Sequence, residues 1–362
     1  MKLYNSEFKI SDKSISLSHP TYFIADIAAN HDGDLSRAKD LIHLAAEAGT
    51  DAAKFQHFHA DTIVSDYDFK STKSQLSHQA KWNKSVYEVY KDASLNLDWT
   101  PILKETCDAA GIHFFTSPYS FELVDNVDDF VPAFKIGSGD ITWTDIIKYI
   151  AKKQKPVLLA TGASTLNDVC TAVEAVVSHN KNIALLQCNT NYTASLENFS
   201  YINLRVLKTF QSMYPRMILG LSDHTPGHAT VLGAVTLGAR IIEKHFTDDQ
   251  NRTGPDHGFS MTLQSWKEMV LRTRELEAAL GTGVKKIEKN EEETVVLQRR
   301  AARAKVLIKE GDALNHDNIE FLRPCPKDAV TPSQFSAFQN HTATRTIPQG
   351  DYLRWSDMKL ES

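Results

Sequence analysis

Short apolar runs alternate with longer stretches of helical periodicity between residues 22 and 281. A typical helical stretch spans 36–49, where Ala38, Leu41, Ile42 and Ala45 recur at a spacing that places them on one face. The apolar runs are short and rich in strand-forming residues, which indicates buried strands. These predicted strands span residues 22–27, 52–55, 112–116, 132–136, 156–160, 183–187, 217–221 and 239–243.

The number of strands and the length of the pattern together predict a closed barrel. Eight β/α units over about 260 residues match a (β/α)8 TIM barrel, an α/β fold of parallel strands surrounded by helices. An open, doubly wound parallel sheet is the alternative architecture. In the stretch 100–111, Thr100 is predicted to cap a helix, Pro101 to take its first position and Gly111 to end it.

The segment 57–99 breaks this rhythm. It is polar, contains Trp82 and Trp99, and is predicted to be a long loop with a helix around Ser85 to Lys91. A long excursion after a strand is often the lid or rim of a binding site, although a passive insertion would show the same pattern.

The pattern changes again after Gly281. A charged stretch is followed by short strand-like pieces separated by turns, which indicates a separate small module. We therefore expect a barrel domain at 1–282, a linker at 283–301 and a small domain at 302–362.

Composition favours a soluble, cytoplasmic protein. Forty Lys and Arg against 45 Asp and Glu leave a formal net charge of -5, which argues against a nucleic-acid partner. The four cysteines form no CxxC pair, so neither a disulfide framework nor a thiolate zinc site is indicated, and a reducing compartment suits them. The first 20 residues contain no signal-peptide core and no later stretch is long enough to cross a bilayer, so no membrane partner is expected.

Two histidines follow consecutive predicted strands. His224, in the motif SDHT, comes after 217–221, and His245, in the motif EKHFT, comes after 239–243. Because the carboxyl ends of parallel strands meet at one end of a barrel, we expect the two imidazoles to lie close together. Neutral imidazole is a common ligand of divalent transition metals. The pair is a candidate metal site, although the spacing alone fits a structural pair equally well.

Further polar side chains follow the other strands. Lys135 precedes a Gly-Ser-Gly turn, and a cation, a hydroxyl and open backbone N–H groups together suit a phosphate. Each lysine alone would also fit a surface position, and Asp256 would equally cap a turn in its loop. The residues expected to converge with the histidines are Asp26, Lys54, Gln56, Ser117, Lys135, Ser138, Asp140, Thr190, Tyr192, Ser222, Glu243 and Asp256.

Eight motifs of this chain, SDHT and EKHFT among them, resemble in sequence and order those of the nonulosonic acid synthases. This family includes the sialic acid synthases and condenses phosphoenolpyruvate with an N-acylated hexosamine. The resemblance covers nearly the whole chain. The C-terminal part, around RRAARAKVLIKEGDAL and NIEFLRP, is similar to the antifreeze-like, or SAF, domain of these enzymes, which has a β-clip fold. The motifs that carry the resemblance are IADIAANHDGD, AAKFQ, FFTSPYS, KIGSGD, LATG, GLSDHT, EKHFT and GPDH.

The resemblance implies a role for each of these positions and a domain-swapped homodimer. His224 and His245 would hold a divalent metal, usually Mn²⁺, with Co²⁺, Mg²⁺, Zn²⁺ or Fe²⁺ as alternatives. Phosphoenolpyruvate would be bound by Lys54, Ser117, Lys135, Ser138, Thr190 and Ser222. The amino sugar would be bound by Asp26, Gln56, Asp140, Tyr192, Asp256 and, from the SAF domain of a second subunit, Arg323. The expected catalytic residues are Asp26, Lys54, Glu243 and Asp256.

The implied reaction is an aldol-like condensation. C3 of phosphoenolpyruvate attacks the carbonyl of the open-chain amino sugar, water adds at C2, and phosphate leaves by cleavage of the C–O bond. Proton transfer falls to Asp26, Glu243, Asp256 or a water on the metal, which the sequence does not rank.

This chain departs from the usual pattern of the family at several rim positions. Asp26 and Asp140 stand where the family usually has Glu, and Ala28, Ala160 and Thr190 are further departures. A carboxylate that is one methylene shorter retracts its oxygens and leaves room for a larger substituent or a water. We therefore expect a modified mannosamine-type acceptor, such as a diacetamido hexose of the legionaminic or pseudaminic type, rather than plain N-acetylmannosamine. Unchanged specificity is the alternative.

Two other functions fit parts of the pattern. A synthase that makes 3-deoxy-octulosonate or heptulosonate phosphates would use a similar barrel, but the SAF-like module argues against it. A catalytically inactive sugar-binding or scaffold protein is the alternative from another class. The joint presence of Lys54, Lys135, His224 and His245 argues against that interpretation.

Overall fold

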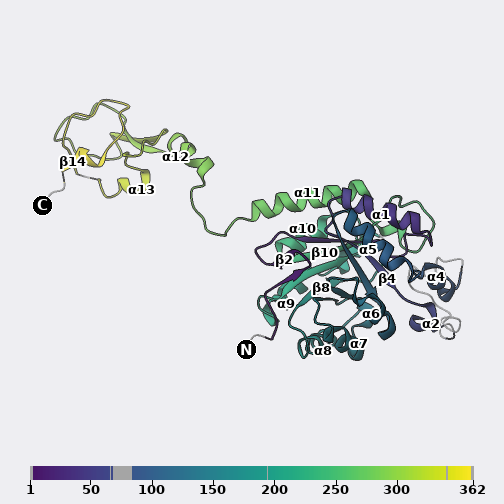
Figure 1. Cartoon of the computed structure of the whole chain (residues 1–362). Coiled ribbons are helices and arrows are strands. Elements are labelled where there is room, and N and C mark those ends of the chain that lie inside the picture. Colours follow the sequence, from purple (N-terminus) through teal and green to yellow (C-terminus); the bar gives the residue numbers. More distant parts are fainter. Residues whose placement is uncertain (1–2, 66, 68–83, 194, 340, 360–362) are drawn as a thin grey trace. The chain divides into compact units, whose positions relative to one another are not determined.

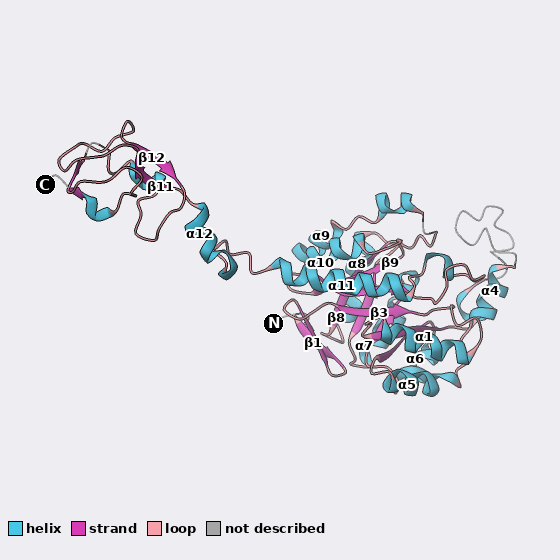
Figure 2. Cartoon of the chain, turned by 90° about the horizontal axis from the view of Figure 1, so that it is seen from above, coloured by secondary structure: helices cyan, strands magenta, loops and turns pink. Residues whose placement is uncertain are grey.

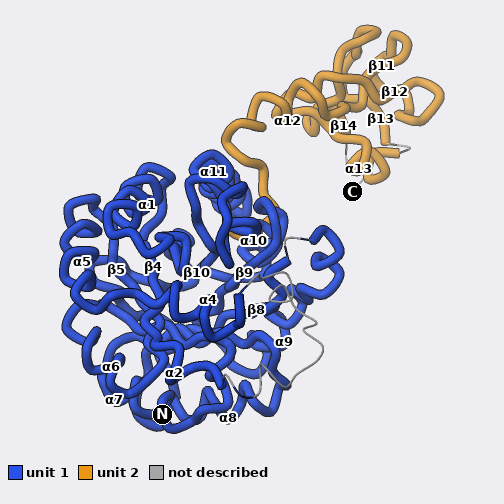
Figure 3. Tube along the Cα trace, turned by 90° about the vertical axis from the view of Figure 1, so that its right-hand side faces the viewer, with its two compact units in different colours: residues 1–281 blue, residues 282–362 orange. Residues whose placement is uncertain are grey.

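The computed structural model describes residues 3–65, 67, 84–193, 195–339 and 341–359. The chain divides after Gly281 into two compact units, residues 1–281 and 282–362, which Figure 3 shows in blue and orange. Trp82, noted in the sequence, lies outside the described residues.

The first unit is built on eight parallel strands. Their hydrogen-bonded order is β5-β4-β3-β10-β9-β8-β7-β6, and the two end strands, β5 and β6, also contact each other. The sheet therefore closes on itself, which confirms the predicted TIM barrel and excludes the open sheet. Every predicted strand is present, as β3 (Tyr22–Asp26), β4 (Ala52–His57), β5 (His113–Pro118), β6 (Phe134–Ile136), β7 (Val157–Ala160), β8 (Ile183–Cys188), β9 (Ile218–Asp223) and β10 (Ala239–His245).

Helices surround the barrel, as Figures 1 and 2 show. The first of them begins after Asp34, whose carboxylate accepts from the backbone N–H groups of Ser36 and Arg37, and its predicted apolar face is buried. These outer helices are α1 (Leu35–Glu47), α5 (Trp99–Ala109), α6 (Phe121–Asp128), α7 (Thr144–Lys152), α8 (Leu166–Val177), α9 (Val206–Met213), α10 (Ala229–Thr236) and α11 (Leu263–Leu280).

The predicted start of α5 is wrong. The helix begins at Trp99 with Asp98 as its N-cap, so Thr100 and Pro101 lie inside the first turn instead of at the cap and the first position. The hydroxyl of Thr100 is buried and bonded to the imidazole of His57, at 2.8 Å from Nε2. The Thr100 side chain, which the local sequence suggested as a helix cap, therefore makes a tertiary hydrogen bond to His57 instead.

A hairpin that the sequence analysis missed closes the amino end of the barrel. Strands β1 (Glu7–Ile10) and β2 (Lys13–Ser16) pair in antiparallel fashion. Phe8, Ile10 and Ile15 pack into one apolar cluster with the first inward-facing side chains of the barrel strands, among them Tyr22 and Ile241. This plug leaves the opposite end, where the strands finish, as the open mouth.

The described residues of the excursion 57–99 include two short helices, α2 (Ala60–Ile63) and α4 (Val86–Ala93). The second confirms the predicted helix. It begins at Ser85, whose hydroxyl accepts from the N–H of Glu88 while the Glu88 carboxylate accepts from the N–H of Ser85. This reciprocal capping stabilises a helix that is too short to be stable by itself.

The second unit has its own small apolar core, to which Ala302, Leu314, Phe335 and Leu353 belong. Its identity as a SAF domain stays a prediction. Within the described residues, no helix has both the length and the apolar character needed to cross a membrane. The elements of this unit are α12 (Glu292–Gln298), β11 (Ala301–Ala304), β12 (Ile319–Leu322), α13 (Pro332–Phe335), β13 (Thr342–Ala343) and β14 (Met358–Lys359).

Candidate functional site

A cavity of about 350 Å³ lies at the carboxyl ends of the barrel strands. All the predicted site residues line it except Thr190 and Arg323. The sequence-predicted residues that it brings together are Asp26, Lys54, Gln56, Ser117, Lys135, Ser138, Asp140, Tyr192, Ser222, His224, Glu243, His245 and Asp256.

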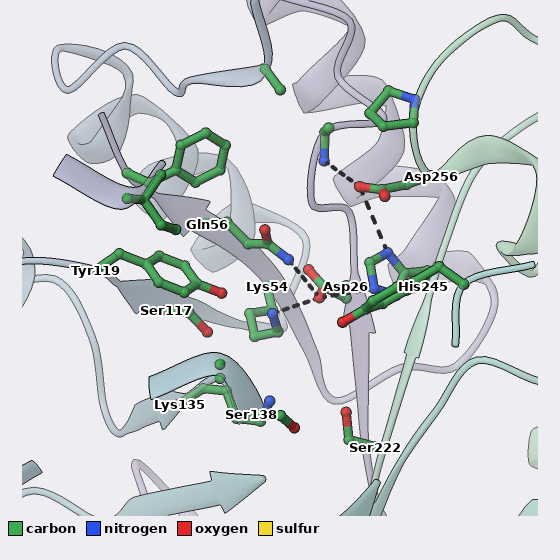
Figure 4. A pocket seen from close by; sticks show the side chains of 18 of the residues that line it. Asp26, Lys54, Gln56, Ser117, Tyr119, Lys135, Ser138, Ser222, His245 and Asp256 are labelled. Carbon is green, nitrogen blue, oxygen red and sulfur yellow. Dashed lines mark hydrogen bonds and ion pairs between the residues drawn. The ribbon is translucent and has the colours of Figure 1, made fainter. Parts of the chain in front are cut away.

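One buried ion pair joins the ends of β3 and β4. Lys54 Nζ lies 2.6 Å from Asp26 Oδ2, and both side chains are 2% exposed. Gln56 Nε2 donates to the same oxygen at 3.3 Å, and the N–H of Ala28 donates to Oδ1 at 3.1 Å. Figure 4 shows Lys54 and Gln56 converging on Asp26. Burial would lower the pKa of Lys54, but the Asp26 carboxylate outweighs it and raises the pKa, so the ammonium stays charged.

A second buried ion pair joins β6 and β10 across the barrel mouth. Lys135 Nζ lies 3.0 Å from Glu243 Oε1, and the Ser222 hydroxyl donates to that oxygen at 3.1 Å. Burial would raise the pKa of Glu243, but the ammonium groups of Lys135 and Lys54 outweigh it and lower the pKa to about 2. Glu243 Oε2 and the hydroxyl of Ser117 are buried without a hydrogen-bond partner among the described residues. A ligand in the cavity would satisfy such polar atoms.

Ser138 contacts Gly162, a position with no room for a side chain. The N–H of Gly162 donates to Ser138 Oγ at 2.9 Å. A Cβ on Gly162 would come within 2.8 Å of Ser138 Oγ and 2.5 Å of a Thr190 methyl carbon. Thr190 lies close to Gly162 and is not among the residues that line the cavity, so its predicted contact with phosphoenolpyruvate stays a prediction.

The two histidines lie side by side, with ring centroids 5.3 Å apart. His224 Nδ1–H donates to the carbonyl of Asn189 at 2.8 Å, which leaves the lone pair of Nε2 available. His245 Nδ1 is buried and has no hydrogen-bond partner among the described residues. Burial is the main cause that lowers the pKa of each ring to about 3. The neighbouring His245 ring adds to this lowering of the pKa at His224, and the Lys54 ammonium adds to it at His245. Both rings are therefore neutral at physiological pH.

This donor set fits a divalent metal. Neutral imidazoles with free lone pairs are suitable ligands, and the bond from His224 to a carbonyl fixes its tautomer in the way that metal-binding histidines are usually held. Among the described residues, no group of three or more His, Cys, Asp or Glu side chains is arranged to hold a metal. Water or substrate would therefore have to complete the ligand shell.

Two further carboxylates line the cavity with raised pKa values. Burial raises the pKa of Asp256 to about 7; this carboxylate accepts from the N–H of Ala29 at 3.2 Å and lies 4.0 Å from His245 Nδ1 (Figure 4). Burial raises the pKa of Asp140 to about 6, and no described residue bonds its carboxylate.

The sequence analysis missed an apolar wall of the cavity. We call it the helical wall, and it consists of Phe58, Ile63, Val89, Tyr90 and Ala93. Phe58 packs against the rings of Tyr90 and Tyr119, at centroid distances of 5.3 and 6.1 Å. The segment 57–99 is thus a rim of the site and not a passive insertion. The position of this segment after β4 indicated a rim, but the local sequence pattern does not predict which of its side chains face the cavity.

Arg323 belongs to the second unit. Its Nε–H donates to the carbonyl of Gln298 at 2.6 Å, and the residue is exposed. Its predicted role at the sugar stays a prediction.

Comparison with known proteins agrees with the motifs. A sequence model of the NeuB family matches residues 41–285. The chain is 35% identical to an uncharacterized protein of Methanocaldococcus jannaschii over 97% of this chain and 98% of that one. It is 33% identical to N,N'-diacetyllegionaminic acid synthase of Campylobacter jejuni over 92% of this chain and 99% of the relative. Among solved structures, N-acetylneuraminic acid synthetase from Leptospira borgpetersenii, in complex with citrate, superposes with a TM-score of 0.69 at 27% identity, covering 80% of this chain and 95% of that one.

The raised pKa of Asp140 predicts a pH-dependent stability difference. In the folded chain this carboxyl ionises near pH 6, above its ordinary value of about 4, so the wild type becomes less stable as the pH rises through that window. Relative to Asp140→Asn, we expect a loss of about 2 to 3 kcal/mol between pH 4 and pH 7, levelling off above. Urea unfolding of both proteins across that range measures it. Parallel pH profiles would contradict the burial of this charge.

Proposed function

Since this chain belongs to the NeuB family, we propose that it condenses phosphoenolpyruvate with the open-chain form of an N-acylated hexosamine and water, releasing a nonulosonic acid and inorganic phosphate. One observation carries the proposal. An anion site and a pair of neutral imidazoles face the same cavity: Lys54, Lys135 and the unpartnered Ser117 hydroxyl on one side, His224 and His245 on the other.

The anion site suits phosphoenolpyruvate. Lys54 and Lys135 are each buried beside a carboxylate, Asp26 and Glu243, which holds the ammonium groups in place before the substrate binds. Ser117, Ser138 and Ser222 add hydroxyls that can donate to phosphate or carboxylate oxygens. Such prearranged donors cost little reorganisation when charge develops.

The reaction balances without any redox partner. The C2–C3 π electrons of phosphoenolpyruvate form the new bond to the sugar carbonyl carbon, and the carbonyl oxygen takes up a proton to become a hydroxyl. Water adds to the electron-poor C2 and loses a proton. The bond from C2 to the phosphate oxygen then breaks, phosphate leaves with the electron pair and takes up the proton of the C2 hydroxyl, and C2 becomes a ketone. Asp26, Glu243 and Asp256 are the carboxylates of the cavity close enough to the two ion pairs and the histidines to exchange these protons.

We propose that His224 and His245 hold a divalent cation, Mn²⁺ being the first candidate. Such a cation would polarise the sugar carbonyl toward attack. The residues of the chain prepare the place for it: Asn189 fixes the tautomer of His224, and Phe259 packs edge-on against the His245 ring at a centroid distance of 4.8 Å. The aromatic contact restricts the rotation of an imidazole whose Nδ1 has no hydrogen-bond partner in the part of the chain that the structure describes.

The helical wall supports an acceptor with apolar substituents and no phosphate. Among the described residues that line the cavity, the cations are Lys54 and Lys135, and both face the proposed phosphoenolpyruvate site. Among these described lining residues, a sugar 6-phosphate would find no positive charge beyond the two lysines. The wall instead offers aliphatic and aromatic carbon, which suits acetyl methyl groups or a deoxy carbon. We therefore propose a diacetamido deoxy hexose of the mannosamine type as the acceptor, as the name of the Campylobacter relative also suggests.

We also propose that two chains form a domain-swapped homodimer in which residues 302–362 act as a SAF domain. Arg323 would then complete the acceptor site of the partner's barrel. Its exposed guanidinium, tethered at Nε by the Gln298 carbonyl, is a suitable group for binding sugar hydroxyls or a carboxylate. We propose that the protein is located in the cytoplasm, since all four cysteines are free.

Removing one imidazole tests the proposed chemistry. His224→Ala should lower Mn²⁺-dependent phosphate release from phosphoenolpyruvate by at least about 100-fold, because two neutral ligands cannot be replaced by one. Phosphate is measured with an acceptor present, and circular dichroism checks the fold. His228→Ala, a half-buried histidine in the turn after β9 that does not line the cavity, is the matched control. Undiminished release from His224→Ala would refute the metal site, and no release from the wild type with any amino sugar would favour the inactive binding protein.

The helical wall predicts a specificity order. The value of kcat/KM should be higher for a 2,4-diacetamido-2,4,6-trideoxy hexose than for N-acetylmannosamine or its 6-phosphate. Val89→Thr, which exchanges one wall methyl for a hydroxyl of the same size, should cost about fourfold with the diacetamido acceptor, since one buried methyl is worth about 0.8 kcal/mol. The rate with N-acetylmannosamine should change little and serves as the internal control. A preference for N-acetylmannosamine in the wild type would overturn the proposed acceptor.

The swapped arrangement predicts complementation between two inactive chains. Co-expressed His224→Ala and Arg323→Ala chains, purified through two different tags, should regain activity, because one barrel with His224 would receive Arg323 from its partner. Mixing His224→Ala with His245→Ala is the control and should stay inactive, since both barrels are damaged. If Arg323→Ala is fully active alone, Arg323 is not a site residue. If the first mixture is inactive, Arg323 does not act across subunits.

A further inference from the structure

Asp223 and Lys244 form a buried ion pair, and each lies one residue before a histidine of the site. They are register partners in the parallel pairing of β9 with β10. Along both strands, side chains alternate between the cavity and the outer core. Leu221 and Ile242 belong to the apolar core under the helices, while Ser222 and Glu243 line the cavity. The pair therefore lies on the outer face of the sheet, behind the two imidazoles.

The pair is the centre of a closed hydrogen-bond network. Lys244 Nζ donates to the Asp223 carboxylate and, at 2.6 Å, to the carbonyl of Thr225. Asp223 Oδ2 also accepts from the hydroxyls of Thr225 and Thr230, both at 2.8 Å. All four side chains are buried, with exposures between 1 and 4%. The network joins the end of β9, the turn after it, the first turn of α10 and the end of β10.

This network holds the backbone next to both imidazoles. His224 lies between Asp223 and Thr225, two members of the network, and His245 directly follows Lys244. Among the described residues His245 Nδ1 has no hydrogen bond and Nε2 lies 3.5 Å from Asp26 Oδ2, so the position of the ring depends on its backbone, on that contact and on ring packing. We therefore expect the network on the outer face of the sheet to influence the distance between the two rings through the backbone that carries them.

A contribution to stability alone does not account for such a pair. Buried ion pairs are often no more stabilising than apolar residues of similar volume, because desolvation offsets the attraction. What a charged, hydrogen-bonded pair adds is a defined geometry. We propose that Asp223 and Lys244 are positioning residues that fix the relative placement of His224 and His245 for a divalent cation. This inference rests on the metal site of the proposed function.

The first measurement is metal affinity in the full chain. Free Mn²⁺ is followed by electron paramagnetic resonance during titration of the metal-free protein. Lys244→Met, and the double variant Asp223→Asn with Lys244→Met that leaves no unpaired buried charge, should bind Mn²⁺ about 10- to 100-fold more weakly than the wild type. Thr230→Val should weaken binding by a smaller factor. Thr273→Val is the matched control, because it removes an equally buried hydroxyl that bonds only a carbonyl within α11.

The second measurement needs no metal. In the protein labelled with ¹⁵N-histidine, the Nδ1–H of His224, donated to Asn189, should give a proton signal protected from exchange, assigned by its absence in His224→Ala. This signal should be lost or should exchange faster in the Lys244 variants and in Thr230→Val, but not in Thr273→Val. A general loss of stability, followed by urea unfolding, would affect Thr230→Val and Thr273→Val alike.

The outcomes separate the two proposals. If folded variants of Asp223 and Lys244 keep both the wild-type Mn²⁺ affinity and the protected imidazole signal, the pair is only structural and the positioning proposal is wrong. If the wild type itself does not bind Mn²⁺, the proposed metal site fails, and the imidazole signal still decides whether the pair positions the rings.

Discussion

The site depends on the alternation of side chains along the parallel strands of a closed barrel. On β10, Ile241, Glu243 and His245 face inward while Ile242 and Lys244 face outward. A shift of one residue in the register with β9 would exchange these two sets and place the imidazoles under the helices. On β3, β9 and β10 the inward row begins with an apolar side chain near the hairpin plug, Tyr22, Ile218 or Ile241, and ends with a polar one at the mouth, Asp26, Ser222 or His245. Core packing and chemistry are therefore specified by the same register.

Charge balance is the second constraint on the mouth of the barrel. Lys54 and Lys135 are almost fully buried, and an ammonium left unpaired in such a place carries a large desolvation cost. Asp26 and Glu243 offset this cost, but the pairing is incomplete, because Glu243 Oε2, Ser117 Oγ and His245 Nδ1 have no partner among the described residues. A site that is neutral enough to fold, yet leaves donors and acceptors unused, is prepared for a ligand that carries both an anion and a carbonyl.

The sequence predicted the parts of the molecule that depend on periodicity. Eight apolar runs located the strands, and their ends located most of the site, because a parallel barrel leaves its strand ends only one place to meet. Parts that depend on contacts between distant segments were missed. The hairpin Glu7–Ser16 is recognisable only by its packing under the barrel. Thr100, predicted to be a helix cap, is hydrogen-bonded to His57.

The helical wall and the strand ends are held by different interactions, and this difference separates specificity from chemistry. The strand ends are fixed by sheet register and buried ion pairs, so a change there disturbs several groups at once. The helical wall depends on α2 and on α4, which begins with a capping box, and on ring contacts such as Phe58 with Tyr90. Substitutions in α4 can reshape the acceptor pocket without moving a lysine or a histidine. A barrel of this kind can therefore change the sugar that it accepts while its condensation chemistry stays in place.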